Sequence, residues 1–176
     1  MKKPEPYQSD LCPPLMDYIK NAASSKQTKV LHFGVCKSKI ADEFLKYKDY
    51  ANLDIYDNNT LSDINQSYNH IICHRFLHTT VDYSRYIKQI FQTLLQGGSL
   101  FVSARSTNCQ EYIRRNKYIQ NNVLDNGYKY IKFFTDNEIN QLLTTTGFTI
   151  IEDGAFTETS RFARKENSYN YAIAVK

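Results

Sequence analysis

The sequence is poor in the residues that build several common kinds of site. Its four cysteines lie far apart and include no CxxC pair, which argues against a paired-cysteine zinc motif and a dense disulfide framework. We therefore expect reduced thiols. No apolar run approaches the length of a membrane span, and no apolar stretch follows the first basic residues as it would in a signal peptide. The sequence thus predicts a soluble, cytoplasmic protein.

Glycine is also scarce, with six residues in the whole chain. Only Gly34 follows the first apolar run, whereas a glycine-rich nucleotide loop has two or three glycines there. A nicotinamide dinucleotide enzyme needs a pyrophosphate cradle that one glycine can hardly make. A nicotinamide dinucleotide enzyme is therefore the weakest of the hypotheses considered, and tight, saturating binding of NAD in a titration would revive it.

Neither sign of charge dominates, since 22 basic and 18 acidic residues give a net charge of +4. The basic residues are dispersed, apart from small clusters at Arg114-Arg115 and 161–165, so a nucleic-acid partner is possible but not favoured. With 176 residues and 41% apolar content, the chain is predicted to form a single domain over 1–176, with a loose lead-in at 1–9.

The chain does contain a regular alternation of strand and helix patterns. An apolar run at 30–33 ends at Gly34, and a helical pattern begins at Ile40; this opening lets backbone approach a ligand beside a helix N-terminus. Helices are predicted at about 12–23, 38–48, 80–96 (closed by Gly97-Gly98) and 135–146. Strands are predicted at about 30–33, 52–56, 70–73, 99–103, 148–151 and 171–175.

The strand patterns indicate the fold class. The early strands are apolar throughout, which favours a mostly parallel α/β sheet with helices on both faces. The last two strands follow one another without a helix, so at least one should be antiparallel. The stretch 57–67 is too polar for a further helix and strand, and 105–132 is predicted to be an insertion or lid over the ligand edge.

The order and spacing of these strand, turn and helix patterns resemble those of a class I S-adenosylmethionine-dependent methyltransferase, of the Rossmann-like group. The resemblance covers about 12–176 and includes a likeness of 116–122 and 133–135 to small-molecule methyltransferases. It implies a seven-stranded sheet whose antiparallel last strand is inserted between the fifth and sixth. It also implies S-adenosylmethionine across the carboxyl ends of the first, second and fourth strands. The motifs are Val30-Leu31-His32-Phe33-Gly34, Asn52-Leu53-Asp54-Ile55, Tyr68-Asn69-His70-Ile71-Ile72-Cys73, Leu94-Leu95-Gln96-Gly97-Gly98-Ser99-Leu100, and Phe134-Thr135-Asp136-Asn137-Glu138 leading to Thr146-Gly147-Phe148.

The resemblance assigns part of the cofactor site to the first turn and the second strand. Gly34 would let the chain turn beneath the methionine part, with the N–H groups of Val35 and Cys36 available to it. Asp54, with Ile55 after it, would accept hydrogen bonds from the ribose hydroxyls. The alternatives are a plain strand-to-helix turn and a solvated loop acid.

The remaining cofactor residues follow the second and fourth strands. Asp57 competes with Asp54 for the ribose. Asp63 and Ile64 resemble the acidic and apolar pair that binds adenine, although Asp63 is equally well read as a turn residue. His74 follows the fourth strand, where the family exposes residues to the methyl-transfer centre.

Histidines and aromatic residues supply the candidates on the acceptor side. His74 or His78 could receive a proton from the acceptor, although a structural histidine is the simpler reading. His70, His74 and His78 are spaced by four but do not share a helix, and nothing completes a ligand set, so no metal is expected. Four further residues could bind the acceptor, or could serve the core or a lid. These are Tyr83, Arg105, Tyr112 and Tyr130.

The sequence thus predicts a methyltransferase that uses S-adenosylmethionine and acts on a small-molecule acceptor. The alternative is a methyltransferase-like module that binds or regulates without catalysis. The single glycine, the contracted 57–67 stretch and the bulky Cys36-Lys37-Ser38 motivate this alternative. A titration with S-adenosylhomocysteine would separate the two.

Overall fold

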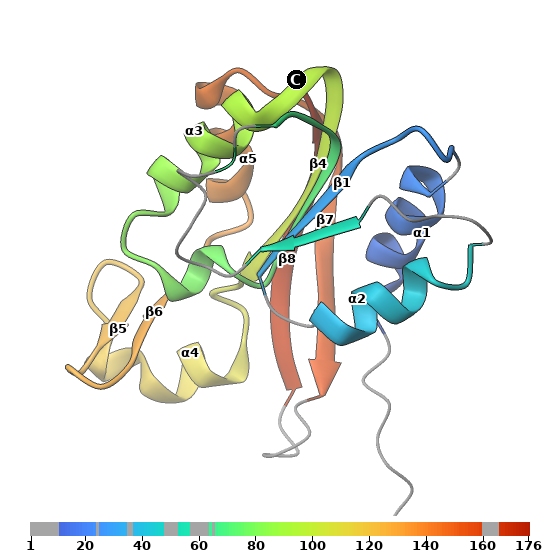
Figure 1. Ribbon diagram of the computed structural model, residues 1–176. Coiled ribbons are helices and arrows are strands. Elements are labelled where there is room, and N and C mark those ends of the chain that lie inside the picture. Colours follow the sequence, from blue (N-terminus) through green and yellow to red (C-terminus); the bar gives the residue numbers. More distant parts are fainter. Residues whose placement is uncertain are drawn as a thin grey trace, which may run out of the picture.

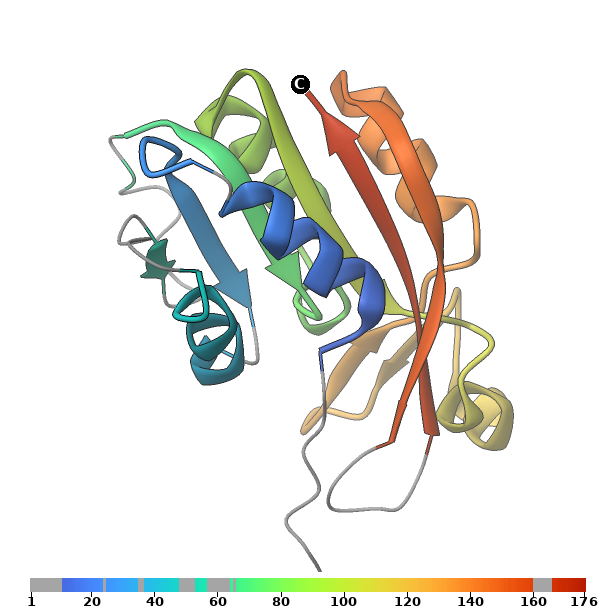
Figure 2. The same ribbon diagram turned by 90° about the vertical axis from the view of Figure 1, so that its right-hand side faces the viewer.

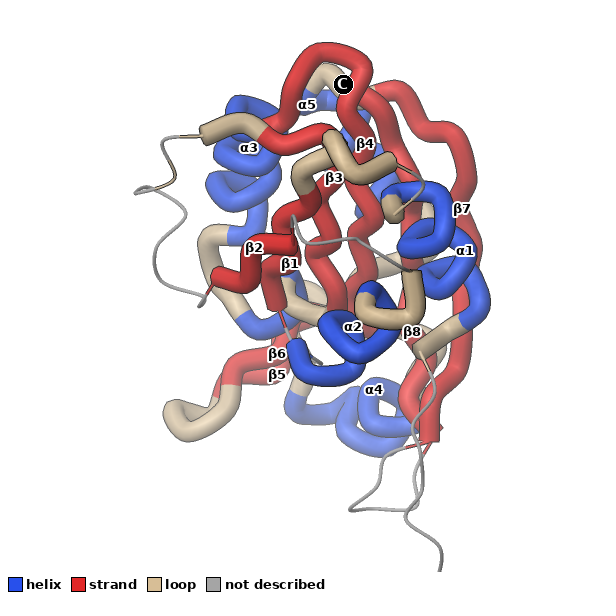
Figure 3. The backbone as a smooth tube through the Cα atoms, turned by 45° about the vertical axis from the view of Figure 1, so that its right-hand side comes forward, coloured by secondary structure: helices blue, strands red, loops and turns tan. Residues whose placement is uncertain are grey.

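The residues that the structure describes form one main sheet of six strands, in the order β2-β1-β3-β4-β8-β7 (Figures 1 and 3). The computed structural model describes residues 11–23, 25–34, 37–47, 53–56, 64, 66–159 and 166–176. The lead-in predicted at 1–9 lies outside these residues. The strands of the main sheet are β1 (Val30–Gly34), β2 (Leu53–Tyr56), β3 (Tyr68–His74), β4 (Leu94–Arg105), β7 (Thr149–Thr159) and β8 (Glu166–Val175).

The sheet is mostly parallel, as predicted. β2, β1, β3 and β4 are parallel neighbours, and β8 runs antiparallel to both β4 and β7, between which it lies. The described part of the sheet has six strands instead of the seven that the resemblance implied. A parallel crossover needs about a dozen residues or more, and the chain between β2 and β3 is too short for an additional helix and strand.

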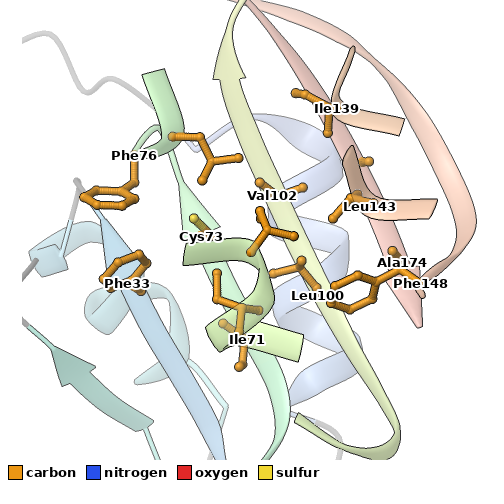
Figure 4. Packing of buried hydrophobic residues seen from close by; sticks show 14 of the residues in the cluster. Phe33, Ile71, Cys73, Phe76, Leu100, Val102, Ile139, Leu143, Phe148 and Ala174 are labelled. Carbon is orange, nitrogen blue, oxygen red and sulfur yellow. The ribbon is translucent and has the colours of Figure 1, made fainter. Parts of the chain in front are cut away.

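Helices cover both faces of the sheet (Figure 2). Side chains alternate along a strand, so Val30 and Ile72 pack with α1 (Pro13–Ala22) and α2 (Lys37–Phe44). Ile71, Cys73 and Val102 pack on the opposite side against α3 (Tyr83–Thr93) and α5 (Glu138–Thr146), as Figure 4 shows. None of the described helices combines the length and the apolar character needed to cross a bilayer.

The Gly97-Gly98 pair corrects one prediction. It does not close α3, which ends at Thr93; the chain is already extended at Leu94, and both glycines lie within β4. A Cβ at Gly98 would lie 2.9 Å from the carbonyl oxygen of Asn69, so the glycine allows two strands to approach closely. By contrast, α5 ends at the predicted Gly147, which is left-handed.

The segment after β4 forms a small unit of its own. It contains α4 (Gln110–Arg115), the short helix η3 (Asn116–Tyr118) and the hairpin β5 (Val123–Asp125)–β6 (Tyr130–Lys132). Cys109, Leu124, Ile131 and Phe133 form its separate core. Strand β6 packs beside η2 (Leu77–Thr79), which follows the end of β3. The insertion predicted at 105–132 therefore lies at the carboxyl edge of the parallel strands (Figure 1).

Candidate functional site

The carboxyl edge of the parallel strands is the place to look for a ligand. From β1 the chain crosses to β2 on one side and then returns to β3 on the other, which makes the gap between β1 and β3 a topological switch point. Open α/β sheets bind ligands at such a point. Gly34 and His74, the last residues of β1 and β3, are paired there.

Gly34 is required by the closeness of these two strand ends. Its φ is +123°, and a Cβ would lie 2.4 Å from the carbonyl oxygen of His74 and 3.3 Å from Cβ of Phe76. No other residue fits this backbone without moving β3. The role of Gly34 toward a cofactor stays a prediction, and Val35, Cys36 and Asp63 lie outside the described residues.

Asp54 does not occupy the predicted position. It pairs with Leu31, two residues before the end of β2, and its carboxylate accepts hydrogen bonds from the Tyr68 hydroxyl at 2.7 Å and from Nε2 of Gln66 at 3.0 Å. Tyr68 is the first residue of β3, so these contacts are made toward the amino end of the strands. The predicted place of Asp54 at the end of the second strand is therefore wrong, and its role toward the ribose stays a prediction. The competing Asp57 follows β2 directly in the sequence and lies outside the described residues.

The two predicted isoleucines have different surroundings. Ile55 is exposed on the edge strand β2. Ile64 is partly buried and packs against the core cluster on the α3 side. An exposed apolar side chain can contact a ligand. Ile64 has a structural role in the core, and its role toward adenine stays a prediction.

His74 is fully buried at the end of β3. Its Nδ1 lies 3.0 Å from the Ser103 hydroxyl oxygen, and its Nε2 lies 3.8 Å from a carboxylate oxygen of Glu158. That Nε2 has no hydrogen-bond partner within the part of the chain that the structure describes. Burial, and next to it the positive charge of Arg75, lowers the pKa of His74 well below its ordinary value, so the ring is neutral at pH 7.

His78 is a second buried and neutral histidine. It lies in η2, 6% exposed, with its ring 5.9 Å from that of Tyr169. Burial, followed by the charges of Arg105 and Arg75, lowers the pKa of His78 to about 3. At neutral pH such a histidine is a poor general base. Both candidate histidines are therefore better suited to hydrogen bonding than to proton abstraction.

Arg75 joins the end of β3 to the distant β7–β8 hairpin. Its φ is +55°, an uncommon value for a residue with a side chain. Its backbone N–H donates to Ser103, and its guanidinium donates to Glu158 at 2.7 Å and lies 4.9 Å from the centre of the Tyr169 ring. Strained backbone of this kind clusters at functional sites. Glu158 and Tyr169 belong to no recognisable sequence motif, so neither could be predicted as a site residue from the sequence.

Arg105 lies beside this cluster, as the last residue of β4. Its guanidinium pairs with Glu111 and lies 5.8 Å from the centre of the Tyr169 ring. Its Nε is buried without a hydrogen-bond partner among the described residues. The structure thus places Arg105, predicted to bind the acceptor, near the candidate histidine His78, which lies beside the same Tyr169 ring.

The three predicted tyrosines divide into two groups. Tyr112 donates a hydrogen bond to Asn122 at 2.8 Å and packs edge-on against Phe133, so it serves the insertion's own core, an alternative that the sequence left open. Tyr83 and Tyr130 are half-buried. The two lie near one another: the pKa of Tyr130 is raised first by burial and then by the nearby Tyr83 hydroxyl. These two remain candidates for the acceptor side.

His70, His74 and His78, which are spaced by four in the sequence, do not point toward a common site. His70 instead places Nδ1 2.7 Å from the Ser99 hydroxyl oxygen, beneath α1. Within the described ranges, no group of three or more histidine, cysteine, aspartate and glutamate side chains is arranged to hold a metal ion.

Comparisons with known proteins agree with this architecture. Residues 14–153 match a family model described as a methyltransferase domain. No curated protein matches the chain. An S-adenosylmethionine-dependent methyltransferase from Methanosarcina mazei has a similar structure, with a TM-score of 0.73 and 17% identity over 95% of this chain and 98% of that one.

Two further solved structures contain S-adenosylhomocysteine. One is the 1,6-didemethyltoxoflavin-N1-methyltransferase of Burkholderia thailandensis, with a TM-score of 0.64 and 15% identity over 93% of this chain and 77% of that one. The other is the N-methyltransferase NodS of Bradyrhizobium japonicum, with a TM-score of 0.55 and 12% identity over 99% of this chain and 93% of that one. At these identities the structural likeness establishes a shared fold.

Proposed function

The chain belongs to the methyltransferase domain family, within the class I S-adenosylmethionine-dependent superfamily, and we propose that it methylates a small-molecule acceptor. S-adenosylmethionine is its cofactor. The observation that carries the proposal is the match to the family model over residues 14–153, which include the switch point between β1 and β3. The bound 1,6-didemethyltoxoflavin of the Burkholderia enzyme supports a small acceptor.

The residues at the carboxyl edge fit this cofactor. Gly34 leaves the end of β1 without a side chain beside the backbone of His74, and Nε2 of His74 is buried with no hydrogen-bond partner among the described residues. Gly34, with the N–H groups of Val35 and Cys36, would hold the methionine part. Asp57 replaces Asp54 as the ribose acid, while Asp63 and Ile64 would contact adenine.

When bound, the cofactor supplies a methyl group already activated by a sulfonium. The protein therefore has mainly to align the acceptor and exclude water, because proximity and orientation supply much of the rate. The neutral His74 and His78 suit this work as hydrogen-bonding groups. A pKa of about 3 gives His78 little capacity to remove a proton at pH 7. We accordingly assign these histidines to acceptor positioning.

A calorimetric titration with S-adenosylhomocysteine tests the cofactor site. We expect one site per chain, and a thermal stabilisation of about 2.7 kcal/mol at a ligand concentration 100 times the dissociation constant. If the folded protein shows no binding heat and no shift in melting temperature at millimolar ligand, the proposal is contradicted.

Transfer of radiolabelled methyl groups tests catalysis separately. The protein and labelled S-adenosylmethionine are incubated with a small-molecule extract, and label is measured in the products. We expect label in a compound of low molecular mass. Tight cofactor binding with no transfer to any extract would favour the binding module instead.

A further inference from the structure

Side chains from three separate segments surround the ring of Tyr169 at the carboxyl edge of the sheet. The guanidinium carbon of Arg75, after β3, lies 4.9 Å from the ring centre, and that of Arg105, at the end of β4, lies 5.8 Å away. The His78 ring, in η2, lies 5.9 Å away. All three segments adjoin the strand ends where the cofactor site is proposed, so this cluster borders the acceptor side.

Two nitrogens in this cluster have unused hydrogen-bonding capacity. Nδ1 of His78 and Nε of Arg105 are both buried and lack a hydrogen-bond partner among the described residues. Arg105 uses its terminal nitrogens toward Glu111 and the Tyr169 hydroxyl, the latter at 3.5 Å. A buried polar group without a hydrogen-bond partner destabilises the fold. A bound molecule that accepts hydrogen bonds from both nitrogens would explain why two unpartnered groups lie around the Tyr169 ring.

The surrounding charge favours an anion that carries one negative charge. The pair of Arg75 with Glu158 is balanced. Glu111, in contrast, is shared by the buried Arg105 and by Lys129 at 2.8 Å, with Arg115 more distant at 3.9 Å. Lys129 and Arg115 are about half exposed, so solvent screens part of their charge. Formally, Arg105, Lys129 and Arg115 exceed Glu111 by two positive charges, and solvent screening of the two exposed side chains reduces this excess, so a monoanion such as a carboxylate is enough to neutralise most of it.

We propose that the methyl acceptor carries a carboxylate, which accepts hydrogen bonds from Nε of Arg105 and Nδ1 of His78. This inference rests on the proposed methyltransferase function and adds the chemical class of the acceptor. His78 is neutral, so it donates from Nδ1 in the tautomer that carries the proton there. Anchored at this point, the rest of the acceptor extends along the edge toward Gly34 and His74.

Matched pairs of small molecules test the inference in protein saturated with S-adenosylhomocysteine. The probes are benzoate, indole-3-acetate and hexanoate, each compared by calorimetry with its uncharged amide. We expect at least one carboxylate to bind tenfold or more tightly than its amide. Preference for a carboxylate in none of the three pairs, or stronger binding of inorganic sulfate than of the best carboxylate, would overturn the inference.

Substitutions locate the binding to the two nitrogens. Arg105→Lys keeps the positive charge beside Glu111 but removes Nε, and should weaken the preferred carboxylate about tenfold. The same change at the exposed Arg114 of α4 is the matched control and should have no effect. Equal effects of the two substitutions would exclude Arg105 as the anchor.

His78 provides an independent test if Arg105→Lys does not fold. His78→Leu should weaken carboxylate binding about tenfold, and His78→Asn, which can place an N–H near the position of Nδ1, should restore most of it. Loss in both variants would contradict a hydrogen-bonding role. The affinity for S-adenosylhomocysteine is measured in every variant: if wild-type protein does not bind it, the proposed function fails, whereas normal binding without carboxylate preference overturns only the acceptor class.

Discussion

The substitution Gly34→Ala tests how the end of β1 is built. A Cβ there would lie 2.4 Å from the carbonyl oxygen of His74, about 1 Å inside ordinary van der Waals contact. Backbone at φ +123° is also unfavourable for alanine. A left-handed alanine costs about 1–2 kcal/mol, and overpacking typically adds about 1–3 kcal/mol. We therefore expect a destabilisation of about 3 kcal/mol.

Thermal unfolding followed by circular dichroism measures this effect. For a domain of this size, each kcal/mol shifts the melting temperature by about 2–4 °C, so Gly34→Ala should lower it by roughly 6–12 °C. Gly127→Ala is the matched control, because Gly127 also has a positive φ, +78°, but a Cβ there would meet nothing within 4 Å. It should cost only about 1 kcal/mol.

Equal losses at Gly34 and Gly127 would refute the reasoning, because the backbone conformation would then account for the whole effect. A second readout is the affinity for S-adenosylhomocysteine in the folded variants. Gly34→Ala must separate the ends of β1 and β3, so it should weaken that affinity, while Gly127→Ala should leave it unchanged.

Three further predictions concern acidic residues. In a calorimetric titration, Asp57→Asn should weaken S-adenosylhomocysteine binding about tenfold or more, whereas Asp54→Asn should leave it nearly unchanged. A larger loss of affinity in Asp54→Asn than in Asp57→Asn would identify Asp54 as the acid that binds the ribose. In a urea titration, Glu138→Ala should destabilise the protein by about 2 kcal/mol. The buried ammonium of Lys132 lies 2.7 Å from the Glu138 carboxylate in the wild type and loses this partner in the variant. An unchanged unfolding midpoint would contradict this expectation. Burial by itself would raise the pKa of Glu138, but Lys132 and the N–H of Thr135 hold it below the ordinary value of 4.5. The stabilisation is therefore present above about pH 4.5 and is lost as the pH falls through the lower folded-state pKa, so wild type and Glu138→Gln should converge in stability in acid.

Much of the fold could be predicted because the relevant signals are local. Apolar periodicity marked α1 and α5, and the backbone N–H of Thr135 donates to Glu138 at 2.7 Å, which is one of the two bonds of the predicted capping box. The helix itself begins at Glu138, three residues later than predicted, with Asn137 at its N-cap. Gly147 ends α5 in the left-handed conformation. Each of these features depends on residues a few positions apart, so the sequence contains the whole interaction.

Strand ends and register were harder to predict. Gly97-Gly98 was interpreted as a helix stop, but a Cβ at Gly98 would lie 2.8 Å from the carbonyl oxygen of Leu95 in the same strand and 2.9 Å from that of Asn69 on a neighbouring strand. The second of these contacts depends on how the strands pair. Asp54 matched a family motif, yet its place opposite Leu31 and its hydrogen bond with Tyr68 follow from how three strands align. The alternation of side chains does not specify such an alignment fully, because a shift of two residues in register keeps every side chain on the same face of the sheet.

The sequence by itself determined the α/β class, the mostly parallel sheet and the resemblance to methyltransferases. Only the tertiary structure decided how the acceptor edge is built, since Arg75 meets Glu158, and Arg105 meets Tyr169, across long stretches of chain. It also decided that His74 and His78 are buried and neutral. Periodicity and capping depend on near neighbours, whereas burial, pKa and ion pairing depend on whatever the fold brings together.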